Sequence, residues 1–340
     1  MSKTTTKKSN RVTLKDIANK VGISTAAVSR SLKGSPDISE ETRQKVIKAA
    51  KEMNYSTNYF ANVLRTGKSK TLCILVPDNA NPYNALLIKG IEETAKKKNY
   101  IVIFMNTNEN EEDERQAIHT AISLQVDGIL AVPVQPENYR NLTLPCILMA
   151  REFDTAQLDD VSFVINNDKK IIELATTHLL ERYHDRPIYF VGGPKELLPT
   201  KIRLNAFQEI LKSQNRQFKS DMALYTENTS RGGFLAAEQL IKEKKPPYSL
   251  VCLGSYIAIG VLKALRNHQV SIPDQVGIVS CDDIEITEYL EIPLTSVHHA
   301  RYTIGSKAAE YIINSLEAEK SYGELLKVVL QPELIIRQST

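Results

Sequence analysis

The spacing of apolar residues along the chain changes near residue 70. Up to that point apolar residues recur every three or four positions, which is the period of an amphipathic helix. Beyond it, short apolar runs alternate with stretches of helical period, a pattern typical of buried strands connected by helices. The sequence therefore predicts a small all-α head followed by a larger α/β body.

Three helices are predicted in the head. In the first, TLKDIANKV, Thr13 is placed to cap the N-terminus, and Asp16 puts a carboxylate in the first turn. The second, TAAVSRSLK, follows a corner at Gly22 and has Ser24 as its cap. The third begins at Ser39. Its expected buried residues are Val46, Ile47, Ala50 and Met53. Two short helices joined by a glycine turn and backed by a third form a helix-turn-helix.

The body contains two successive series of strands and helices. Strands of the first series are expected at 71–77, 100–106, 127–133 and 146–150. Those of the second series are expected at 162–165, 187–193, 222–225, 249–254 and 276–283. Two such series predict two lobes, each a doubly wound parallel sheet. Such lobes bind ligands beyond the carboxyl ends of their strands and between each other.

Composition narrows the class of protein. The chain has 340 residues, 42% hydrophobic and 24% charged, which is ordinary globular composition. Its 4 cysteines lie far apart in apolar runs, and their spacing matches neither a metal clamp nor a redox pair. We therefore expect no metal and no cofactor. Without a long apolar span or a signal-like N-terminus, the sequence predicts a cytoplasmic protein with no membrane partner.

Charge is distributed unevenly along the chain. Residues 1–70 contain 15 Lys and Arg against 5 Asp and Glu, whereas the remainder contains 28 against 35. A basic head on an acidic body favours binding of a polyanion, because neutralised phosphates release counterions. A solvated basic tail would explain the charge alone, but the helix-turn-helix pattern favours DNA.

The second helix is expected to read DNA. If Val28 and Leu32 face the core, Thr25, Ala26 and Arg30 face outward on a helix that can enter the major groove. Small residues allow close approach to the bases, and an arginine can contact guanine with two hydrogen bonds. Hydroxyls and lysines are suited to phosphates. The candidate DNA-binding residues of the head are Thr13, Ser24, Thr25, Ala26, Ser29, Arg30 and Lys33.

At this point a family resemblance becomes specific. VTLKDIANKVGISTAAVSRSLKGSPDISEETRQKVIKAAKEMNY closely resembles the head of the lactose-repressor (LacI/GalR) family of bacterial transcription regulators. The body resembles, less tightly, a sensor of the periplasmic-binding-protein type, in which the chain crosses three times between lobes. The resemblance implies a regulator, most often a repressor. It also implies that the exposed pair Thr25 and Ala26 sets operator preference.

The segment STNYFANVLRTGKSK is expected to form a short, weak helix followed by a polar tether. The resemblance implies that this hinge folds on DNA and that Leu64 wedges into the central base step. Asn58 is a further candidate DNA contact. A plain linker is the alternative. The run TGKS lacks the first glycine and the strand of a phosphate-binding loop, so nucleotide hydrolysis is rejected.

These observations divide the chain into domains. The helix-turn-helix domain is expected at 1–57, the hinge helix and linker at 58–70, and the effector-binding and dimerisation domain at 71–340. Within the last, the first lobe takes about 71–166 and 298–327, and the second takes about 167–297 and 328–340. The three crossings between lobes are expected near Asn167, Val297 and Val328.

Four residues at strand ends and in the loops after them are candidate effector contacts, and the resemblance supports them. They are Tyr83, Arg151, Arg203 and Asp282. Two arginines and a carboxylate converging from both lobes can hold the hydroxyls of a small polar ligand. The alternative is that each side chain pairs with a neighbour where the lobes meet.

The class of effector stays open. The resemblance implies aspartates where this chain has Asn166 and Ser255, which weakens the usual binding of a polyol. A sugar is the first expectation, and a purine, a nucleoside or a partner protein are alternatives. A purely ligand-binding protein would not need the head. An enzyme is disfavoured because no serine lies in a nucleophile elbow, and neighbouring His298 and His299 point different ways in extended backbone.

A dimer is the expected assembly. Each head can read only a few base pairs, so specific binding requires two heads on a pseudo-palindromic operator. The bodies would join the two copies. A ligand between the lobes would then change the spacing of the heads, and DNA and ligand would alter each other's affinity by the same factor.

Overall fold

The computed structural model describes residues 12–55, 63, 67–153, 158, 160–318 and 325–340. Asn58, Leu64 and the hinge helix expected around them lie outside these residues. The chain divides into two compact units, Met1–Ser69 and Lys70–Thr340, which are considered separately below.

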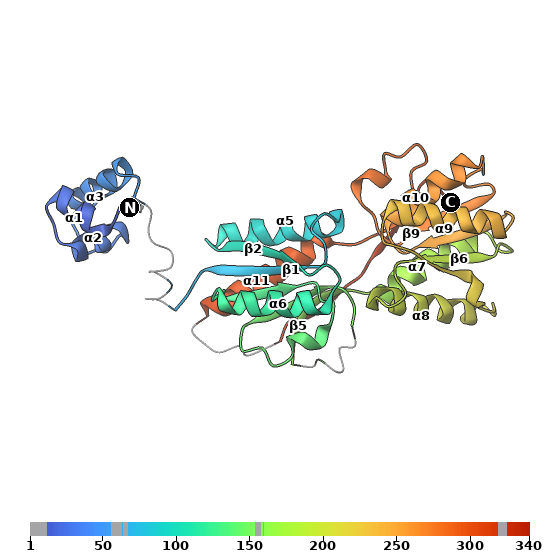
Figure 1. Ribbon diagram of the computed structural model, residues 1–340, viewed down its shortest axis with the longest axis horizontal. Coiled ribbons are helices and arrows are strands. Elements are labelled where there is room, and N and C mark those ends of the chain that lie inside the picture. The colour runs from blue at the N-terminus through green and yellow to red at the C-terminus, as the bar shows by residue number, and fades with distance from the viewer. Residues whose placement is uncertain (1–11, 56–62, 64–66, 154–157, 159, 319–324) are drawn as a thin grey trace, which may run out of the picture. The chain divides into compact units, whose positions relative to one another are not determined.

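The first unit contains the three predicted helices, α1 (Leu14–Val21), α2 (Thr25–Leu32) and α3 (Glu40–Glu52) (Figure 1). Thr13 and Asp16 close a capping box at α1, since the Asp16 carboxylate accepts from the Thr13 amide at 2.8 Å. Gly22 ends this helix in the left-handed conformation, with φ 79°. The Ser24 hydroxyl accepts from the Ala27 amide at 3.1 Å and caps α2.

A small apolar core joins the three helices, and it corrects one prediction. Its fully buried members are Ile17, Ala18, Val28, Val46, Ala49 and Ala50. Ile47, which was expected in this core, is 43% exposed. On α3 the inward positions are Val46, Ala49 and Ala50, and a residue one place after Val46 lies about 100° around the helix.

The first lobe of the body is built on a six-stranded parallel sheet in the order β11-β5-β4-β3-β1-β2 (Figure 1). The strands are β1 (Thr71–Val76), β2 (Ile101–Asn106), β3 (Gly128–Ala131), β4 (Cys146–Ala150), β5 (Ser162–Asn166) and β11 (Lys327–Leu330). Helices α5 (Pro82–Lys97) and α11 (Arg301–Glu317) share a core on one face. Helix α6 (Glu111–Ser123) covers the other, with the short helix η1 (Pro136–Tyr139) nearby.

The second lobe repeats this plan with the order β12-β10-β9-β8-β6-β7. Its strands are β6 (Ile188–Gly192), β7 (Ala223–Tyr225), β8 (Tyr248–Cys252), β9 (Val276–Ser280), β10 (Thr295–His298) and β12 (Glu333–Ile335). Its helices are α7 (Asp168–Arg182), α8 (Leu198–Ser213), α9 (Ser230–Glu243), α10 (Ser255–Asn267), η2 (Ser220–Met222) and η3 (Glu285–Thr287). In Figure 1, α7 and α8 lie on the opposite side of the sheet from α9 and α10. The edge strand β12 is antiparallel to β10. The prediction of a wholly parallel sheet is therefore wrong for this lobe.

The crossings between lobes differ slightly from the predicted positions. Strand β10 continues to His298, so the second crossing follows that residue and does not lie at Val297. Strand β11 pairs with β5 in the first lobe, so the third crossing comes after Leu330 and not at Val328. The run KVVL reads as a strand in sequence, but nothing in its own residues says which sheet edge it joins.

Helices α5 and α11 touch backbone to backbone. A Cβ atom on Gly90 would lie 2.3 Å from the carbonyl oxygen of Tyr302, and one on Gly305 would lie 2.2 Å from that of Leu87. Only glycine fits at these two positions. Among the described helices, none is both long and apolar enough to cross a membrane.

Candidate functional site

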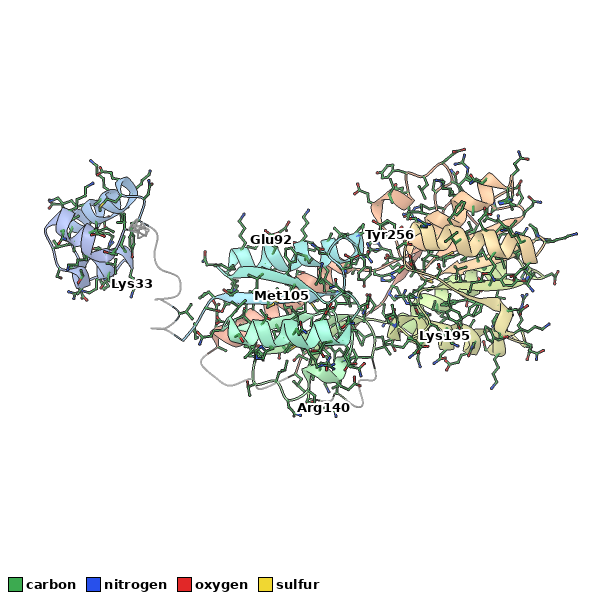
Figure 2. The ribbon with its side chains drawn as sticks, viewed as in Figure 1. Lys33, Glu92, Met105, Arg140, Lys195 and Tyr256 are labelled. Carbon is green, nitrogen blue, oxygen red and sulfur yellow. The ribbon has the colours of Figure 1, made fainter. Side chains whose placement is uncertain are left out.

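The head presents the surface predicted for reading DNA. Val28 is fully buried, and Thr25, Ala26 and Arg30 are exposed on the other side of α2. Lys33 is also exposed and projects from the head (Figure 2). The exposed side of this helix is therefore small at its N-terminus and basic toward its end.

Three other candidate residues of the head have local bonds or partial burial. Ser29 is half-buried, whereas Thr13 and Ser24 are exposed. The Thr13 hydroxyl donates to the Asp16 carboxylate at 2.8 Å, and the Ser24 oxygen caps α2. The backbone hydrogen bond from Thr13, and then the hydroxyl bond, lower the pKa of Asp16. These caps hold the helix N-termini in place whether or not DNA is present.

The second candidate site is a cleft in the body with about 940 Å³ of empty space, part of it open to solvent. Its lining includes Asp78 after β1, Arg151 after β4 and Asp282 after β9, so it lies at the carboxyl ends of strands from both sheets. All four candidate effector contacts line it, namely Tyr83, Arg151, Arg203 and Asp282.

The two lining arginines are each paired inside their own lobe. Arg203 donates from Nε and Nη2 to Asp168 Oδ1, at 2.9 and 2.6 Å, and from Nη1 to the Leu253 carbonyl at 2.9 Å. Burial works to lower the pKa of Arg203, but the Asp168 carboxylate outweighs it and holds that pKa above its usual value. Arg151 binds the Glu109 carboxylate with both terminal nitrogens and donates to the Pro133 carbonyl at 3.1 Å.

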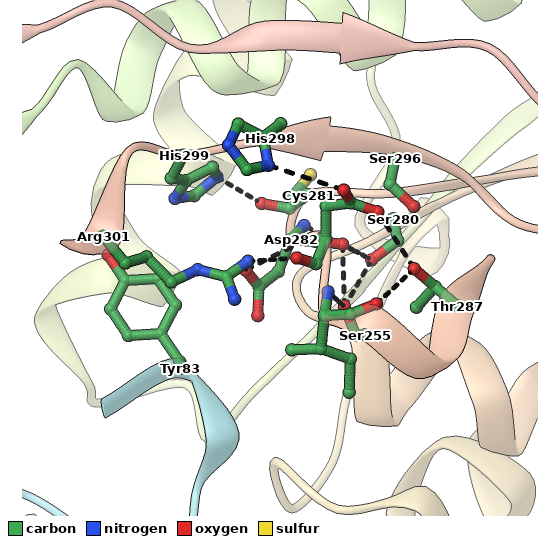
Figure 3. Close-up of polar contacts among 12 residues, drawn as sticks. Tyr83, Ser255, Ser280, Cys281, Asp282, Thr287, Ser296, His298, His299 and Arg301 are labelled. Atoms are coloured by element: carbon green, nitrogen blue, oxygen red, sulfur yellow. Dashed lines mark hydrogen bonds and ion pairs between the residues drawn. The ribbon is translucent and has the colours of Figure 1, made fainter. Parts of the chain in front are cut away.

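Asp282 is paired as well, with a residue that sequence analysis did not select. Arg301 Nη2 bonds Asp282 Oδ1 and donates to the Asp283 carbonyl at 2.6 Å (Figure 3). The Arg301 side chain is 1% exposed, and its guanidinium lies 4.9 Å from the centre of the Tyr83 ring. Among the described residues none donates to Asp282 Oδ2, so this oxygen is left for a ligand.

Tyr83 and His299 pack edge to face, with 5.9 Å between ring centres (Figure 3). The Tyr83 oxygen accepts from Asn166 Nδ2 at 2.6 Å, and burial raises the pKa of Tyr83 to about 12. His299 Nε2 lies 2.9 Å from the Cys281 carbonyl, which can only accept, so Nε2 carries the hydrogen. Burial, then Arg203 and Arg301, hold the pKa of His299 well below its usual value, and the ring is neutral.

The two positions at which aspartates were expected serve the cleft indirectly. Asn166 donates to the Ala150 carbonyl at 2.9 Å in addition to Tyr83. The Ser255 hydroxyl donates to the Asp282 carbonyl at 2.7 Å. These side chains therefore hold Tyr83 and the Asp282 loop in place, and neither offers a carboxylate.

The structure places all four candidates at the cleft, and their contact with an effector stays a prediction. Each side chain lines the cleft, and each is also bonded to a neighbour. Four neighbours of these side chains were not predicted from the sequence, namely Glu109, Asp168, His299 and Arg301. The rule that ligands meet strand ends could have selected them, because they follow β2, β5 and β10 closely. No three His, Cys, Asp or Glu side chains of the described residues are grouped to hold a metal ion.

Two family profiles match the chain. The profile for "Bacterial regulatory proteins, lacI family" matches residues 13–58. That for "Periplasmic binding proteins and sugar binding domain of LacI family" matches residues 69–332, which is more than half of the chain.

Similar proteins cover the chain from head to body. The HTH-type transcriptional repressor CytR of Escherichia coli (strain K12) is 29% identical over 339 residues, 98% of each chain. The ribose operon repressor of the same strain is 27% identical over 311 residues, 89% of this chain and 93% of the other. A solved structure of the lac repressor dimer bound to operator and the anti-inducer ONPF has a TM-score of 0.82 at 19% identity. It covers 97% of this chain and 99% of that chain, and this likeness concerns the fold.

Proposed function

The chain belongs to the LacI family of bacterial regulatory proteins, and from that premise we propose that it represses transcription by binding a pseudo-palindromic operator as a homodimer. It is a DNA-binding regulator with an effector-binding domain, and not an enzyme. A small polar ligand in the cleft, in the first instance a sugar, controls its affinity for the operator. The observation that carries this proposal is one chain with both an exposed reading helix and a cleft lined by all four candidate contacts.

The head, residues 1–57, reads the operator and the segment 58–70 connects it to the body. Thr25, Ala26 and Arg30 contact base edges. The phosphate contacts are Thr13, Ser24, Ser29 and Lys33. Asn58 and Leu64 act in the hinge. The division of the chain into two compact units between Ser69 and Lys70 supports a head that moves as one piece.

The ligand is proposed to be a sugar because the cleft side chains that can still form hydrogen bonds suit hydroxyl groups. Asp282 Oδ2 can accept a hydrogen bond, and the Tyr83 hydroxyl, which accepts from Asn166, can still donate one. The aromatic ring of Tyr256, which also lines the cleft, can cover the apolar face of a sugar ring. The same ring could cover a nucleoside base, so purines and nucleosides are the second class to test.

A homodimer is proposed from the apolar surface at the free edge of the first sheet. Among the described strands, β2 has a neighbour on one side only, and its Ile101 and Phe104 are 51% and 53% exposed. Leu86 of α5 and Ile122 of α6 are exposed at 44% and 46% on the helices that flank this strand. Exposed apolar side chains along an open sheet edge and on the helices beside it are typical of an interface, here proposed with a second copy.

The function is tested by operator binding in the presence of candidate ligands. A duplex selected from random DNA by the full chain is titrated with and without D-ribose, cellobiose, uridine and hypoxanthine, using fluorescence anisotropy. A sugar should change the operator dissociation constant, and Asp282→Asn should remove that change because it lowers the charge of the ligand's acceptor. Failure to select any duplex would contradict operator binding. A response to the nucleoside or purine alone would reassign the ligand, and a response to none would favour a partner protein.

A further inference from the structure

The arginines around the cleft all form ion pairs with carboxylates. Arg151 is paired with Glu109, and Arg203 with Asp168. Arg301, behind the lining, is paired with Asp282. No lysine lines the cleft along the described parts of the chain, and His299 is neutral. Arg301 Nε and Nη1 are buried without a hydrogen-bond partner in the described structure, but Arg301 does not line the cleft. A negatively charged group entering here would meet only guanidiniums that already pair with a carboxylate.

Carboxylates, in contrast, exceed cations at the lining. The four lining carboxylates are Asp78, Glu109, Asp168 and Asp282, against the two guanidiniums of Arg151 and Arg203. Asp78 is exposed and its Oδ1 accepts only a local amide hydrogen bond, from Ala80 at 2.9 Å. A phosphate placed in the cleft would therefore lie beside negative charge, with a dielectric lower than that of water to strengthen the repulsion.

Helix N-termini are the remaining groups that could attract an anion. Helices α8 and α10 begin at the cleft without a side-chain cap, and each terminus carries about half a positive charge. On α8 the second residue is Pro199, which has no N–H to offer. The start of α7 is already covered, because the Glu152 carboxylate accepts from the Asp168 amide at 2.7 Å. Together these termini do not offset the carboxylates and the double charge of a phosphate.

The uncommitted hydrogen-bonding groups suit neutral hydroxyls instead. Asp282 Oδ2 accepts, Tyr83 can donate its hydroxyl hydrogen, and His299 Nδ1 is a buried acceptor without a partner in the described structure. A hydroxyl both donates and accepts, so a set of neighbouring hydroxyls satisfies all three groups, whereas a phosphate can only accept from them.

We propose that the cleft selects an uncharged, hydroxyl-rich ligand and excludes the phosphorylated form of the same compound. This inference rests on the proposed function, in which the ligand that controls the repressor binds in this cleft. It adds that the regulated signal is the free compound, as it exists before any kinase acts on it or after a phosphatase has released it.

Matched pairs of compounds test the inference. Titration calorimetry of the full chain at fixed ionic strength compares D-ribose with D-ribose 5-phosphate, D-glucose with D-glucose 6-phosphate, and uridine with uridine 5′-monophosphate. The free member of at least one pair should bind, and its phosphate should bind at least about tenfold more weakly, which corresponds to about 1.4 kcal/mol.

A charge variant provides the second measurement. Glu109→Gln leaves the Arg151 guanidinium without its carboxylate, so the discrimination within the binding pair should shrink. Asp221→Asn is the matched control, because it removes the same charge from a surface ion pair, 2.7 Å from Lys244, that does not line the cleft. The Asp221→Asn variant should prefer the free compound over its phosphate by the same factor as the unchanged chain.

The outcomes separate the inference from the function on which it rests. A phosphorylated member that binds as tightly as its free partner, or more tightly, would overturn the inference and leave a sugar-controlled repressor intact. If Glu109→Gln and the unchanged chain prefer the free compound over its phosphate by the same factor, charge at the lining does not set that preference. This result would also overturn the inference. Silence from every pair would contradict both the sugar-binding function and the selectivity inferred from it.

Discussion

At the scale of single residues, the head and the cleft use arginine in opposite ways. Arg30 is exposed, and within the described structure no hydrogen bond or ion pair involves its side chain, so its guanidinium remains available to another molecule. Arg203 and Arg301 are bonded by carboxylates and carbonyl oxygens, and they hold the shape of the cleft. Arginine is therefore left available to a partner in one unit, whereas in the other it is bonded to carboxylates.

Arg30→Ala should relax the choice of base at one position of each operator half-site. A bidentate contact between arginine and guanine contributes about 1–3 kcal/mol of discrimination. Lys33→Ala is the control, and it should weaken binding by similar amounts on all sequences, because a phosphate contact carries no base information. Affinities for a set of single-base operator variants would decide, and an unchanged base preference in Arg30→Ala would contradict the assignment of the reading helix.

At the scale of elements, the contact between α5 and α11 connects the cleft to the first residue of the body. Arg301 is the first residue of α11, and Glu317, the last, forms an ion pair of 3.0 Å with Lys70. Between them, Gly90 and Gly305 bring the two helix backbones together. The pair of helices is therefore closely packed, with the cleft near one end and Lys70, where the linker joins the body, at the other.

Gly305→Ala should destabilise the body by about 1–3 kcal/mol, because its added methyl group cannot fit against the Leu87 carbonyl without moving a helix. Gly254→Ala is a matched control, since its methyl group would meet only the Asn228 side chain at 3.5 Å, an ordinary contact. Chemical unfolding of the two variants beside the unchanged chain measures the difference. Equal free energies of unfolding would contradict the close crossing of these helices.

At the scale of the whole molecule, the proposed homodimer depends on the open edge of the first sheet. Phe104→Lys should convert a dimer into monomers in sedimentation experiments, because a charged side chain would be buried at the interface. Operator affinity should then fall roughly 100-fold or more, since the two heads no longer bind as one. Ile336→Lys, a control at a residue that is 62% exposed in the second lobe, should remain dimeric. If Phe104→Lys remains a dimer, the interface does not include this edge of the sheet.

Local rules predicted most of the elements. The caps at Thr13 and Ser24 predicted the starts of two helices, and the period of apolar residues predicted β1 to β9 but not β10, β11 or β12. The rule that doubly wound sheets bind ligands at strand ends also selected four residues that all line the cleft.

Pairings between distant residues were not predictable in the same way. The ion pairs Glu109–Arg151 and Asp168–Arg203 form only when separate segments of the chain come together in the fold. The sequence alone does not show which segments these are. The edge joined by β11 is a similar choice, because either sheet could have accepted an apolar strand. The prediction that Ile47 is buried was wrong for a simpler reason. It rested on the apolar side chain and not on the direction in which position 47 points from α3.

The threading of the last residues through both lobes has a consequence for synthesis on the ribosome. The first lobe needs α11 and β11, and the second needs Ser339, whose hydroxyl donates to the Ile278 carbonyl at 2.7 Å. At about 5–20 residues per second, the head is made roughly 15–60 s before these segments emerge. A nascent chain would therefore carry a finished DNA-binding head beside two open apolar sheets. Chaperones that cover such sheets during translation would set how much repressor matures.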